Sequence, residues 1–366
     1  MTRSELIPFA LLVAAAVACL SFALSFFSSK LARAFGVVDM PSGGRKIHAR
    51  SVPLWGGLGI ACTLVIALIT TLWYNIFLSG GLGTRQLAGY LVGVLILLVG
   101  GLVDDRRPLP PRAQILFPIL AALAVIASGT GIIQITNPAT QRGFSLIWWK
   151  SGFFSLPADL ITFAWLLIAT YATKLLDGLD GLVAGMAVIG SALVGALSSS
   201  LSFFQPGIAI LSAIIGGAYL GILPRNAHPS KLFLGEAGST IAGFSLGVLA
   251  ILSSAKVAIA LTVLAIPITD VALVIGSRIR RGVPWYEGDN AHLHFRLLQA
   301  GLSQRTAVFL LWAIALFAGL IALTLQTRGK IFLIATLIVL TTLMSFGIGS
   351  RRIDERRERT RKRDAR

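Results

Sequence analysis

Acidic residues and histidines gather in a few short polar stretches of an otherwise apolar chain. The stretches are Arg45-Lys46-Ile47-His48, Asp104-Asp105, Asp177-Gly178-Leu179-Asp180-Gly181, Gly235-Glu236-Ala237-Gly238-Ser239 and His292-Leu293-His294. Carboxylates bind hard cations such as Mg²⁺, and histidine and arginine bind phosphate groups. These residue types suit chemistry on phosphorylated substrates if the fold brings the stretches together.

Two adjacent carboxylates, Asp104 and Asp105, directly follow an apolar run. Two like charges at a membrane edge are costly unless a cation, a proton or a basic substrate compensates them. They also face the negative end of their own helix dipole. We therefore expect a functional pair. The alternative is local compensation by Arg106, Arg107 and Arg112.

Two further motifs combine acids with glycine. Asp177 and Asp180 are three residues apart and share one face if the segment is helical, while the glycines allow close approach to a ligand. The alternative is a helix-breaking loop with incidental acids. Glu236 and Ser239 precede an apolar run, so they either start a helix or lie beside a phosphate-tolerant turn, with Glu236 as an oxygen ligand for Mg²⁺.

The paired histidines His292 and His294 are followed by Arg296. Zinc binding is disfavoured, because no cysteine is near and the accessible carboxylates suit a harder cation. Phosphate binding by histidine and arginine is the preferred interpretation. Solvated loop histidines without a role are the alternative.

Composition indicates a polytopic membrane protein. Of 366 residues, 55% are hydrophobic and only 13% charged, and apolar runs recur that match the roughly 20 residues a helix needs to cross a bilayer. Because helices satisfy their own backbone in lipid, we predict an all-α transmembrane helical bundle with eleven spans. The predicted spans are 6-28, 55-79, 86-103, 114-130, 156-173, 182-203, 206-223, 240-254, 257-276, 306-325 and 331-349. Residues 1-349 form a single membrane domain and 350-366 a basic tail.

The net charge of +17 is explained by topology. With eleven spans, one alternating set of loops carries 25 of the 32 Lys and Arg residues and the other set seven. The positive-inside rule then places the N-terminus outside and the C-terminus in the cytoplasm, together with every polar stretch. Nucleic acid is therefore not an expected partner. The basic tail either lies along anionic headgroups or is solvated and disordered.

The remaining features suggest no chemistry. Cys19 and Cys62 fall inside predicted spans, so neither a disulfide framework nor a metal cluster is indicated. The outer stretch 131-155 contains Trp148 and Trp149 and is predicted to be an interfacial loop or a short hairpin.

The order of the motifs resembles the polyprenyl-phosphate N-acetylhexosamine-1-phosphate transferase family, glycosyltransferase family 4, which includes the phospho-MurNAc-pentapeptide translocase. The resemblance covers almost the whole chain. It rests on Val38-Asp39-Met40-Pro41, Arg45-Lys46-Ile47-His48, Pro53-Leu54-Trp55-Gly56-Gly57, Gly101-Leu102-Val103-Asp104-Asp105 and His292-Leu293-His294-Phe295-Arg296-Leu297-Leu298. The first basic motif and the histidine loop are more similar to the branch that uses UDP-N-acetylhexosamines.

This resemblance implies transfer of a sugar-1-phosphate from a UDP-sugar to polyprenyl (undecaprenyl) phosphate, with release of UMP, to start a cell-envelope glycan such as lipopolysaccharide. It implies Mg²⁺, with Mn²⁺ as the alternative ion, a bacterial plasma-membrane location with a cytoplasmic site, and leaves room for a homodimer. By resemblance, Asp104 or Asp105 accepts a proton from the lipid phosphate or orients it, and Glu236 with Asp105 holds the metal. The expected nucleotide-sugar or phosphate contacts are Lys174, Asp177, Asp180, Asn226, His292, His294 and Arg296, and the lipid-phosphate candidates are Lys46 and His48. Lys174 is expected either to fold back on Asp177, three residues away, or to reach a phosphate of the sugar nucleotide.

Four positions depart from the family pattern. The family usually has Asn where Lys174 stands and Asp where Glu236 stands, a basic residue is common at Gln114, and a third His is frequent at Phe295. These departures motivate one alternative, a member that binds lipid or nucleotide without turnover. The other alternative, a transporter, would carry ionisable residues at mid-membrane. Since Asp270 is the one clear intramembrane acid, the enzyme is favoured.

Overall fold

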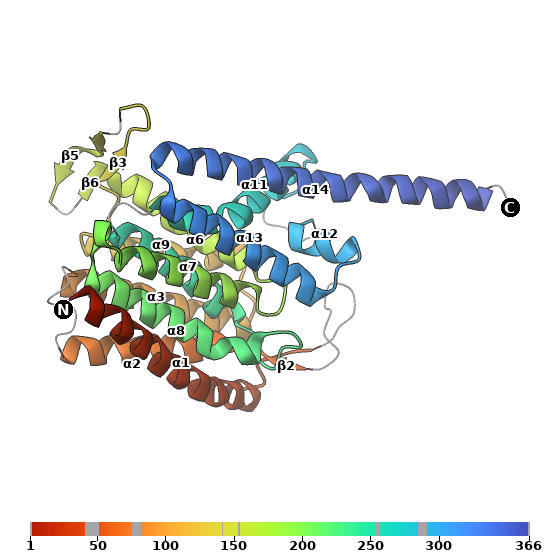
Figure 1. Cartoon of the computed structure of the whole chain (residues 1–366). Helices are drawn as coiled ribbons and strands as arrows, with labels where there is room; N and C mark the ends of the chain where they lie inside the picture. Colours follow the sequence, from red (N-terminus) through yellow and green to blue (C-terminus); the bar gives the residue numbers. More distant parts are fainter. Residues whose placement is uncertain are drawn as a thin grey trace.

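Long helices make up most of the chain in the computed structural model (Figure 1). The structure describes residues 2–40, 51–74, 82–140, 142–152, 154–253, 257–284 and 291–364. The predicted lipid-phosphate contacts Lys46 and His48 lie outside these ranges. The helices are α1 (Arg3–Ala34), α2 (Gly56–Trp73), α3 (Thr84–Arg106), α4 (Pro111–Gln114), α5 (Leu116–Ala127), α6 (Ala158–Leu176), α7 (Leu182–Ser198), α8 (Pro206–Asn226), α9 (Gly235–Leu252), α10 (Val257–Val263), α11 (Ala265–Arg280), α12 (Leu293–Gln299), α13 (Gln304–Thr324) and α14 (Thr327–Asp364).

Each predicted span coincides with a helix or a pair of helices. Within the described residues, eight helices are long and apolar enough to cross a membrane, and a ninth span results if α10 and α11, bent by 65° at their junction, count as one. The segments predicted at 114-130 and 182-203 correspond to shorter apolar helices, Pro111–Ala127 and Leu182–Ser198. The chain is therefore an all-α polytopic membrane protein. α14 continues as a helix through the segment predicted to be a basic tail.

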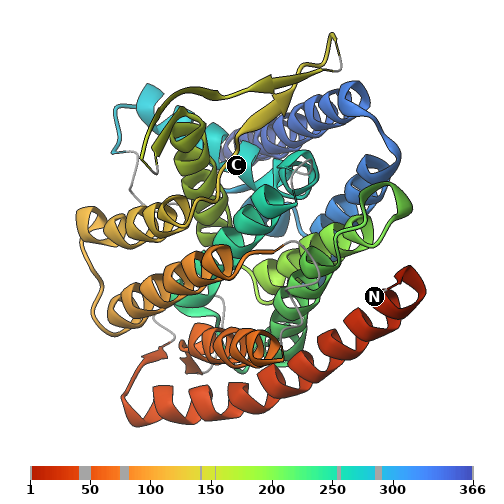
Figure 2. The ribbon, with the colours of Figure 1, turned by 90° about the vertical axis from the view of Figure 1, so that its left-hand side faces the viewer.

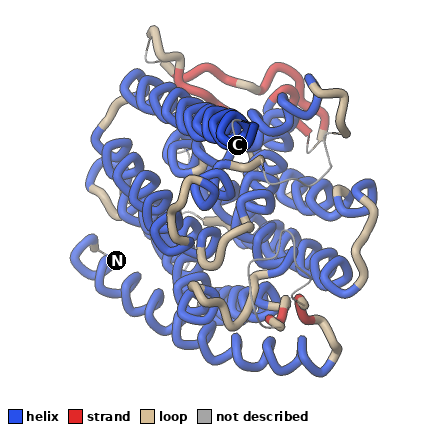
Figure 3. The backbone as a smooth tube through the Cα atoms, turned by 90° about the vertical axis from the view of Figure 1, so that its right-hand side faces the viewer, coloured by secondary structure: helices blue, strands red, loops and turns tan. Residues whose placement is uncertain are grey.

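Within the described ranges, six short strands pair into three antiparallel ribbons, drawn in red in Figure 3. They are β1 (Val38–Asp39) with β2 (Val52–Pro53), β3 (Gln134–Thr136) with β4 (Gly143–Ser145), and β5 (Ile147–Ser151) with β6 (Phe154–Pro157). The hairpin predicted in 131-155 is therefore confirmed, and Trp148 and Trp149 on β5 are exposed. Figure 1 places β3, β5 and β6 at one end of the bundle and β2 and α12 at the other.

Helix α9 lies at the centre of the bundle. It packs against α2, α3, α6, α7, α8 and α10, and nearly all of its residues from Ala237 to Ile251 are buried. Figure 2, viewed from one end, shows it enclosed by the other helices. The helices that contact α9 are therefore all positioned by their packing against this one helix.

Glycine allows three of these helices to approach α9 closely. A Cβ atom at Gly57 of α2 would lie 2.3 Å from the amide nitrogen of Gly238, and one at Gly101 of α3 would lie 2.3 Å from the amide nitrogen of Ala237. On α9 itself, a Cβ at Gly243 would lie 2.1 Å from the carbonyl oxygen of Ala169 on α6. Small residues at such crossings bring backbones into van der Waals contact, which drives helix association in lipid.

We expect Gly101→Ala to destabilise the protein, because its methyl group has no room against the backbone of α9. Overpacking of this kind costs about 1–3 kcal/mol. The measurement is thermal unfolding of the purified protein in detergent. Gly276→Ala in α11 is the matched control, since a Cβ there meets no described atom within 4 Å. Equal unfolding midpoints for the two variants would contradict the tight α3–α9 contact.

Candidate active site

A cavity of about 1130 Å³ collects residues from most of the polar stretches. It is lined by residues of the β1–β2 region, the ends of α3, α6 and α8, and the start of α9. The predicted site residues among its lining are Asp104, Asp105, Lys174, Asp177, Asp180, Asn226 and Glu236. The stretches at 104–105, 177–181 and 235–239 therefore meet in one place, while the stretch at 45–48 lies outside the described residues and His292 and His294 are not part of the lining.

The backbone at the start of α9 fixes Asp105. The amide of Glu236 donates a 2.9 Å hydrogen bond to Oδ1 of Asp105, while Oδ2 is buried and has no hydrogen-bond partner among the described residues. Gly235 makes this approach possible, because its φ is +70° and a Cβ there would lie 2.4 Å from Oδ2. A non-glycine residue would both strain the backbone and push the carboxylate away.

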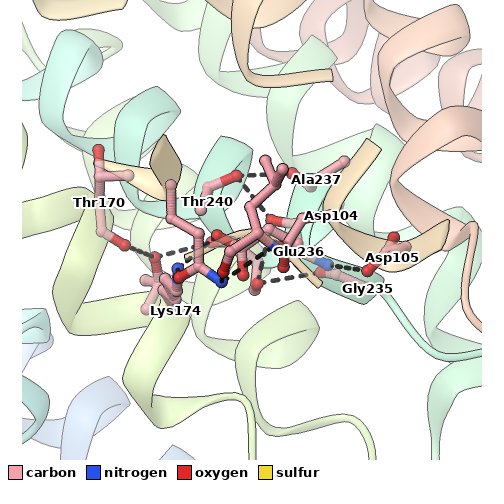
Figure 4. A network of polar contacts seen from close by, with 12 residues as sticks. Asp104, Asp105, Thr170, Lys174, Gly235, Glu236, Ala237 and Thr240 are labelled. Carbon is pink, nitrogen blue, oxygen red and sulfur yellow. Dashed lines mark hydrogen bonds and ion pairs between the residues drawn. The ribbon is translucent and has the colours of Figure 1, made fainter. Parts of the chain in front are cut away.

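A chain of side chains fixes Asp104 (Figure 4). The Gln114 side-chain amide donates to Oδ1 of Asp104 at 2.9 Å, and the backbone amide of Leu109 donates to the same oxygen at 2.8 Å. The Lys174 ammonium in turn donates to Oε1 of Gln114 at 3.0 Å and lies 2.6 Å from Oε1 of Glu236. One ammonium group thus joins the carboxylates of α3 and α9.

Two alternatives predicted from the sequence are wrong for this polar network. Asp104 and Asp105 make no ion pair with Arg106, Arg107 or Arg112 among the described contacts, so local compensation does not explain them. The Lys174 ammonium does not fold back on Asp177, one of the two positions expected for it. The reason is that α6 ends at Leu176, so Asp177 no longer follows the helical spacing.

The segment 177–181 is a turn, so the expectation that Asp177 and Asp180 share a helical face is wrong. Asp180 instead reaches the loop after α8, where its Oδ2 lies 2.8 Å from Nδ1 of His228 and accepts from the Ser230 amide at 3.1 Å. Burial raises the pKa of Asp177 to about 8, and the negative charges of Glu236 and Asp180 act in the same direction.

Asn226 holds the loop after α8 in shape. Its Nδ2 donates to the Leu232 carbonyl at 3.0 Å, and its Oδ1 is buried with no hydrogen-bond partner among the described residues. Glu236 starts α9, as the helix-start alternative states, and at the same time contacts Lys174 in the cavity. Ser239 donates to the Gly235 carbonyl and so does not cap the helix.

The histidine motif packs behind the turn that carries Asp177. Nδ1 of His292 lies 2.8 Å from Oδ2 of Asp270, whose other oxygen accepts from the Leu293 amide at 2.7 Å. His294 stacks on His292 with ring centroids 5.7 Å apart, and a Cβ at Gly178 would lie 2.3 Å from its Nε2. His292 and His294 are 5% and 1% exposed, so the solvated-loop alternative is wrong.

The same motif contributes Phe295 to the cavity lining, which does not include His292, His294 or Arg296 among the described residues. Burial lowers the pKa of His294 to about 3, which keeps the ring neutral. Arg296 donates to the backbone carbonyls of Ala291 and Ser345. The phosphate contacts expected for His292, His294 and Arg296 stay predictions. The contacts shown here support the acidic turn and join α12 to α14.

Three side chains that bind the site residues in these networks were not predicted from the sequence as partners: Gln114, His228 and Asp270. Gln114 stood out only as a departure from the family pattern, although it connects Lys174 to Asp104. Asp270 stood out as a buried acid, and its position inside an apolar helix was the signal that it needed a partner such as His292.

The donor chemistry of the cavity fits a hard cation. Asp105 has a buried carboxylate oxygen with no described hydrogen-bond partner, and Glu236 follows the glycine that contacts that oxygen. All of these donors are oxygens, which Mg²⁺ prefers. The described residues contain no group of three His, Cys, Asp or Glu side chains already placed to hold a metal.

Sequence comparison identifies a matching family model and relatives that align with most of the chain. The glycosyl transferase family 4 model matches residues 87–254. The chain is 30% identical over 325 residues to a probable undecaprenyl-phosphate N-acetylglucosaminyl 1-phosphate transferase of Bacillus subtilis (strain 168), covering 86% of each chain. It is 31% identical over 324 residues to the decaprenyl-phosphate N-acetylglucosaminephosphotransferase of Mycolicibacterium smegmatis, covering 80% of this chain and 75% of the relative.

A third relative is the undecaprenyl-phosphate alpha-N-acetylglucosaminyl 1-phosphate transferase of Escherichia coli (strain K12), with 28% identity over 312 residues, 81% of this chain and 78% of the relative. The helices are those of a polytopic membrane protein, and the family model and the relatives identify the class as a transferase. The chain belongs to glycosyl transferase family 4.

We expect Gly235→Ala to destabilise the protein more than Gly282→Ala, by about 1 kcal/mol or more, because only the first substitution also brings a methyl group against the Leu54 carbonyl oxygen, at 2.2 Å, and against Oδ2 of Asp105. The two glycines have φ values of +70° and +67°, and a Cβ at Gly282 meets no described atom within 4 Å. Gly282→Ala therefore measures the backbone strain alone. The measurement is thermal unfolding in detergent, and an equal loss in both variants would show that the Asp105 contact contributes nothing.

Proposed function

We propose that the protein transfers an N-acetylhexosamine-1-phosphate from a UDP-sugar to polyprenyl phosphate, releasing UMP, and so starts an envelope glycan. Membership of glycosyl transferase family 4 and the names of the three relatives support this class of reaction. The observation that carries it is the cavity that brings Asp104, Asp105 and Glu236 together with Lys174.

The chemical problem is that one phosphate anion must attack another. In a direct transfer, a lipid-phosphate oxygen forms a bond to the phosphorus that carries the sugar, and the bond from that phosphorus to the bridging oxygen breaks, so that UMP leaves with the electron pair. In a transfer through a phospho-aspartate, an aspartate oxygen forms that bond and UMP leaves, and a lipid-phosphate oxygen then attacks the same phosphorus and releases the aspartate. In either case Asp104 or Asp105 takes the proton of the lipid phosphate or orients it.

The position of the two aspartates suits a lipid substrate. They follow the membrane-spanning part of α3, where Val99 and Val103 are exposed hydrophobic residues. A polyprenyl chain in the bilayer could therefore keep its apolar tail beside α3 while its phosphate reaches Asp104. The nucleotide sugar would enter from the water side, near Asp177, Asp180 and Asn226.

We further propose that Asp105 and Glu236 hold Mg²⁺, with Mn²⁺ as the alternative ion. When bound, the ion supplies positive charge to the diphosphate and to the leaving UMP. Asp105 offers the buried Oδ2 that has no described partner. Lys174 contacts one oxygen of the Glu236 carboxylate. The lysine and the ion would therefore either compete for this carboxylate or each bind one of its oxygens.

The distribution of Lys and Arg among the loops supports a cytoplasmic cavity, and the bacterial relatives support a bacterial plasma membrane. UDP-sugars are made in the cytoplasm, in keeping with that orientation. A homodimer remains compatible with the proposal. Turnover by the purified protein separates this proposal from the member that binds lipid or nucleotide without reacting.

Purified protein should release UMP from a UDP-N-acetylhexosamine when polyprenyl phosphate and Mg²⁺ are present. We expect Asp104→Asn and Asp105→Asn each to reduce this release by about 10³-fold or more, because the amide keeps the shape but cannot take a proton or bind metal as a carboxylate does. UMP is measured by chromatography, and thermal unfolding checks that the variants fold.

The matched control is Asp159→Asn, which removes a carboxylate from α6 at the end near the hairpins. Wild-type protein that releases no UMP from any UDP-sugar tested would overturn the proposed function. Near wild-type release by Asp104→Asn or Asp105→Asn would remove that residue from the mechanism.

Metal dependence gives a separate prediction. Removal of divalent ions with EDTA should stop UMP release, and Mg²⁺ should restore it. Glu236→Gln should raise the Mg²⁺ concentration for half-maximal activity by about tenfold or more, because it replaces a carboxylate ligand by an amide. Titration of Mn²⁺ followed by electron paramagnetic resonance measures binding without turnover. Unchanged Mn²⁺ affinity in Glu236→Gln would show that Glu236 is not a ligand.

A further inference from the structure

Three polar side chains from separate helices meet beside Asp104. Gln114, Lys174 and Glu236 belong to α4, α6 and α9, far apart in the sequence. The Lys174 ammonium lies 2.6 Å from Glu236 and donates to Gln114 at 3.0 Å. Figure 4 shows Lys174 and Glu236 within the same polar network. Side chains that three helices bring into one network suggest a single structural unit.

The three side chains fit one another by length and by polarity. The amide of Gln114 accepts from Lys174 with its oxygen and donates to Asp104 with its nitrogen, which a lysine at position 114 could not do, because an ammonium group has no acceptor. Glu236 is one methylene longer than aspartate, so an aspartate would withdraw the carboxylate by about 1.5 Å. The 2.6 Å contact with Lys174 would then be lost.

The charges are consistent with the same arrangement. Among the described contacts of Asp104 and Glu236, Lys174 is the one cation, and it reaches Asp104 through Gln114. A second ammonium at position 114 would lie beside the first and repel it. An asparagine at position 174 with Gln114 unchanged would leave both carboxylates without a cation. Of positions 114 and 174, only one can therefore carry a positive charge without repulsion between two ammonium groups.

We propose that Gln114, Lys174 and Glu236 form one interdependent unit, in which α6 supplies through Lys174 the positive charge that both Glu236 and Asp104 need. Lys174 is then a positioning residue that holds the Glu236 carboxylate directly and Asp104 through Gln114. The consequence for turnover rests on the proposed function. The coupling among the three side chains does not.

The test is a double-mutant cycle. Lys174→Asn and Gln114→Lys should each lower kcat/KM for UMP release by about tenfold or more, an effect within the usual range for residues in contact. The double variant, which moves the charge from position 174 to position 114, should recover to within about threefold of wild type. Two harmful substitutions that repair each other distinguish an interdependent unit from three independent side chains.

Glu236→Asp adds a third arm to the cycle. In the wild-type background it should lower the thermal unfolding midpoint, since the shorter carboxylate leaves Lys174. In the Lys174→Asn, Gln114→Lys background it should lower the midpoint by less than half as much, because the contact is already absent. An equal loss in both backgrounds would overturn the inclusion of Glu236 in the unit.

A matched control places the new charge elsewhere in the same cavity. Gln304 lines the cavity from the start of α13, so Gln304→Lys combined with Lys174→Asn restores the net charge without restoring the contact. We expect no recovery. Recovery equal to that of Gln114→Lys would show that only net charge matters and would overturn the proposal.

Thermal unfolding in detergent measures the cycle without substrate. The double variant should unfold at a higher temperature than the sum of the two single losses predicts. If the wild type releases no UMP but the unfolding cycle shows this coupling, the proposed function fails and the unit stands. If the losses are additive in both unfolding and turnover, the proposal is overturned whatever the activity of the wild type.

Discussion

The close packing of α9 against α3 and α6 is the constraint on which the site depends. Gly101 brings the backbone of α3 against Ala237, and Gly243 brings α9 against Ala169 of α6. These crossings place the ends of three helices within reach of one another. Asp105 can then accept from the Glu236 amide, and Lys174 can contact the Glu236 carboxylate. Larger residues at the crossings would separate the helices and with them the carboxylates.

Charge in this protein is gathered at the ends of apolar helices. Asp104, Asp105, Asp177 and Glu236 line the same cavity, and like charges at such short range repel unless cations or protons compensate them. Lys174 supplies part of that compensation. Substrate phosphates add further negative charge, which makes a bound cation physically reasonable. The neutral His294 behind the acidic turn adds no positive charge of its own.

The sequence predicts the helices well, because a run of about 20 apolar residues has few alternatives in lipid. It also predicts that Asp105 and Glu236 meet, because the parity of the spans puts their loops on one side. It does not predict the partners of individual side chains. Lys174 was expected near Asp177, three residues away, yet it contacts Glu236, 62 positions further along the chain.

The choice of Glu236 over Asp177 as the partner of Lys174 depends on where α6 ends and on how closely α9 approaches α6. Neither is determined by the residues that neighbour Lys174 in the sequence. The pairing of His292 with Asp270 has the same origin, since it requires α12 to dock against α11. Turn geometry was the other source of error. Asp177 and Asp180 follow a helix directly, but the glycines on either side let the chain turn, and Gly181 has a φ of +82°.

The two neighbouring aspartates are held in different ways, and this has a consequence for how the protein can evolve. Asp105 accepts from a backbone amide, which every residue type except proline supplies at position 236. Asp104 also accepts from the Leu109 amide, but it depends in addition on the side chain of Gln114, and through it on Lys174. Drift at positions 114 and 174 therefore changes the contacts of Asp104, while Asp105 keeps its place as long as position 235 is glycine. Over generations, one aspartate would be inherited as a fixed point while the surroundings of the other diversify.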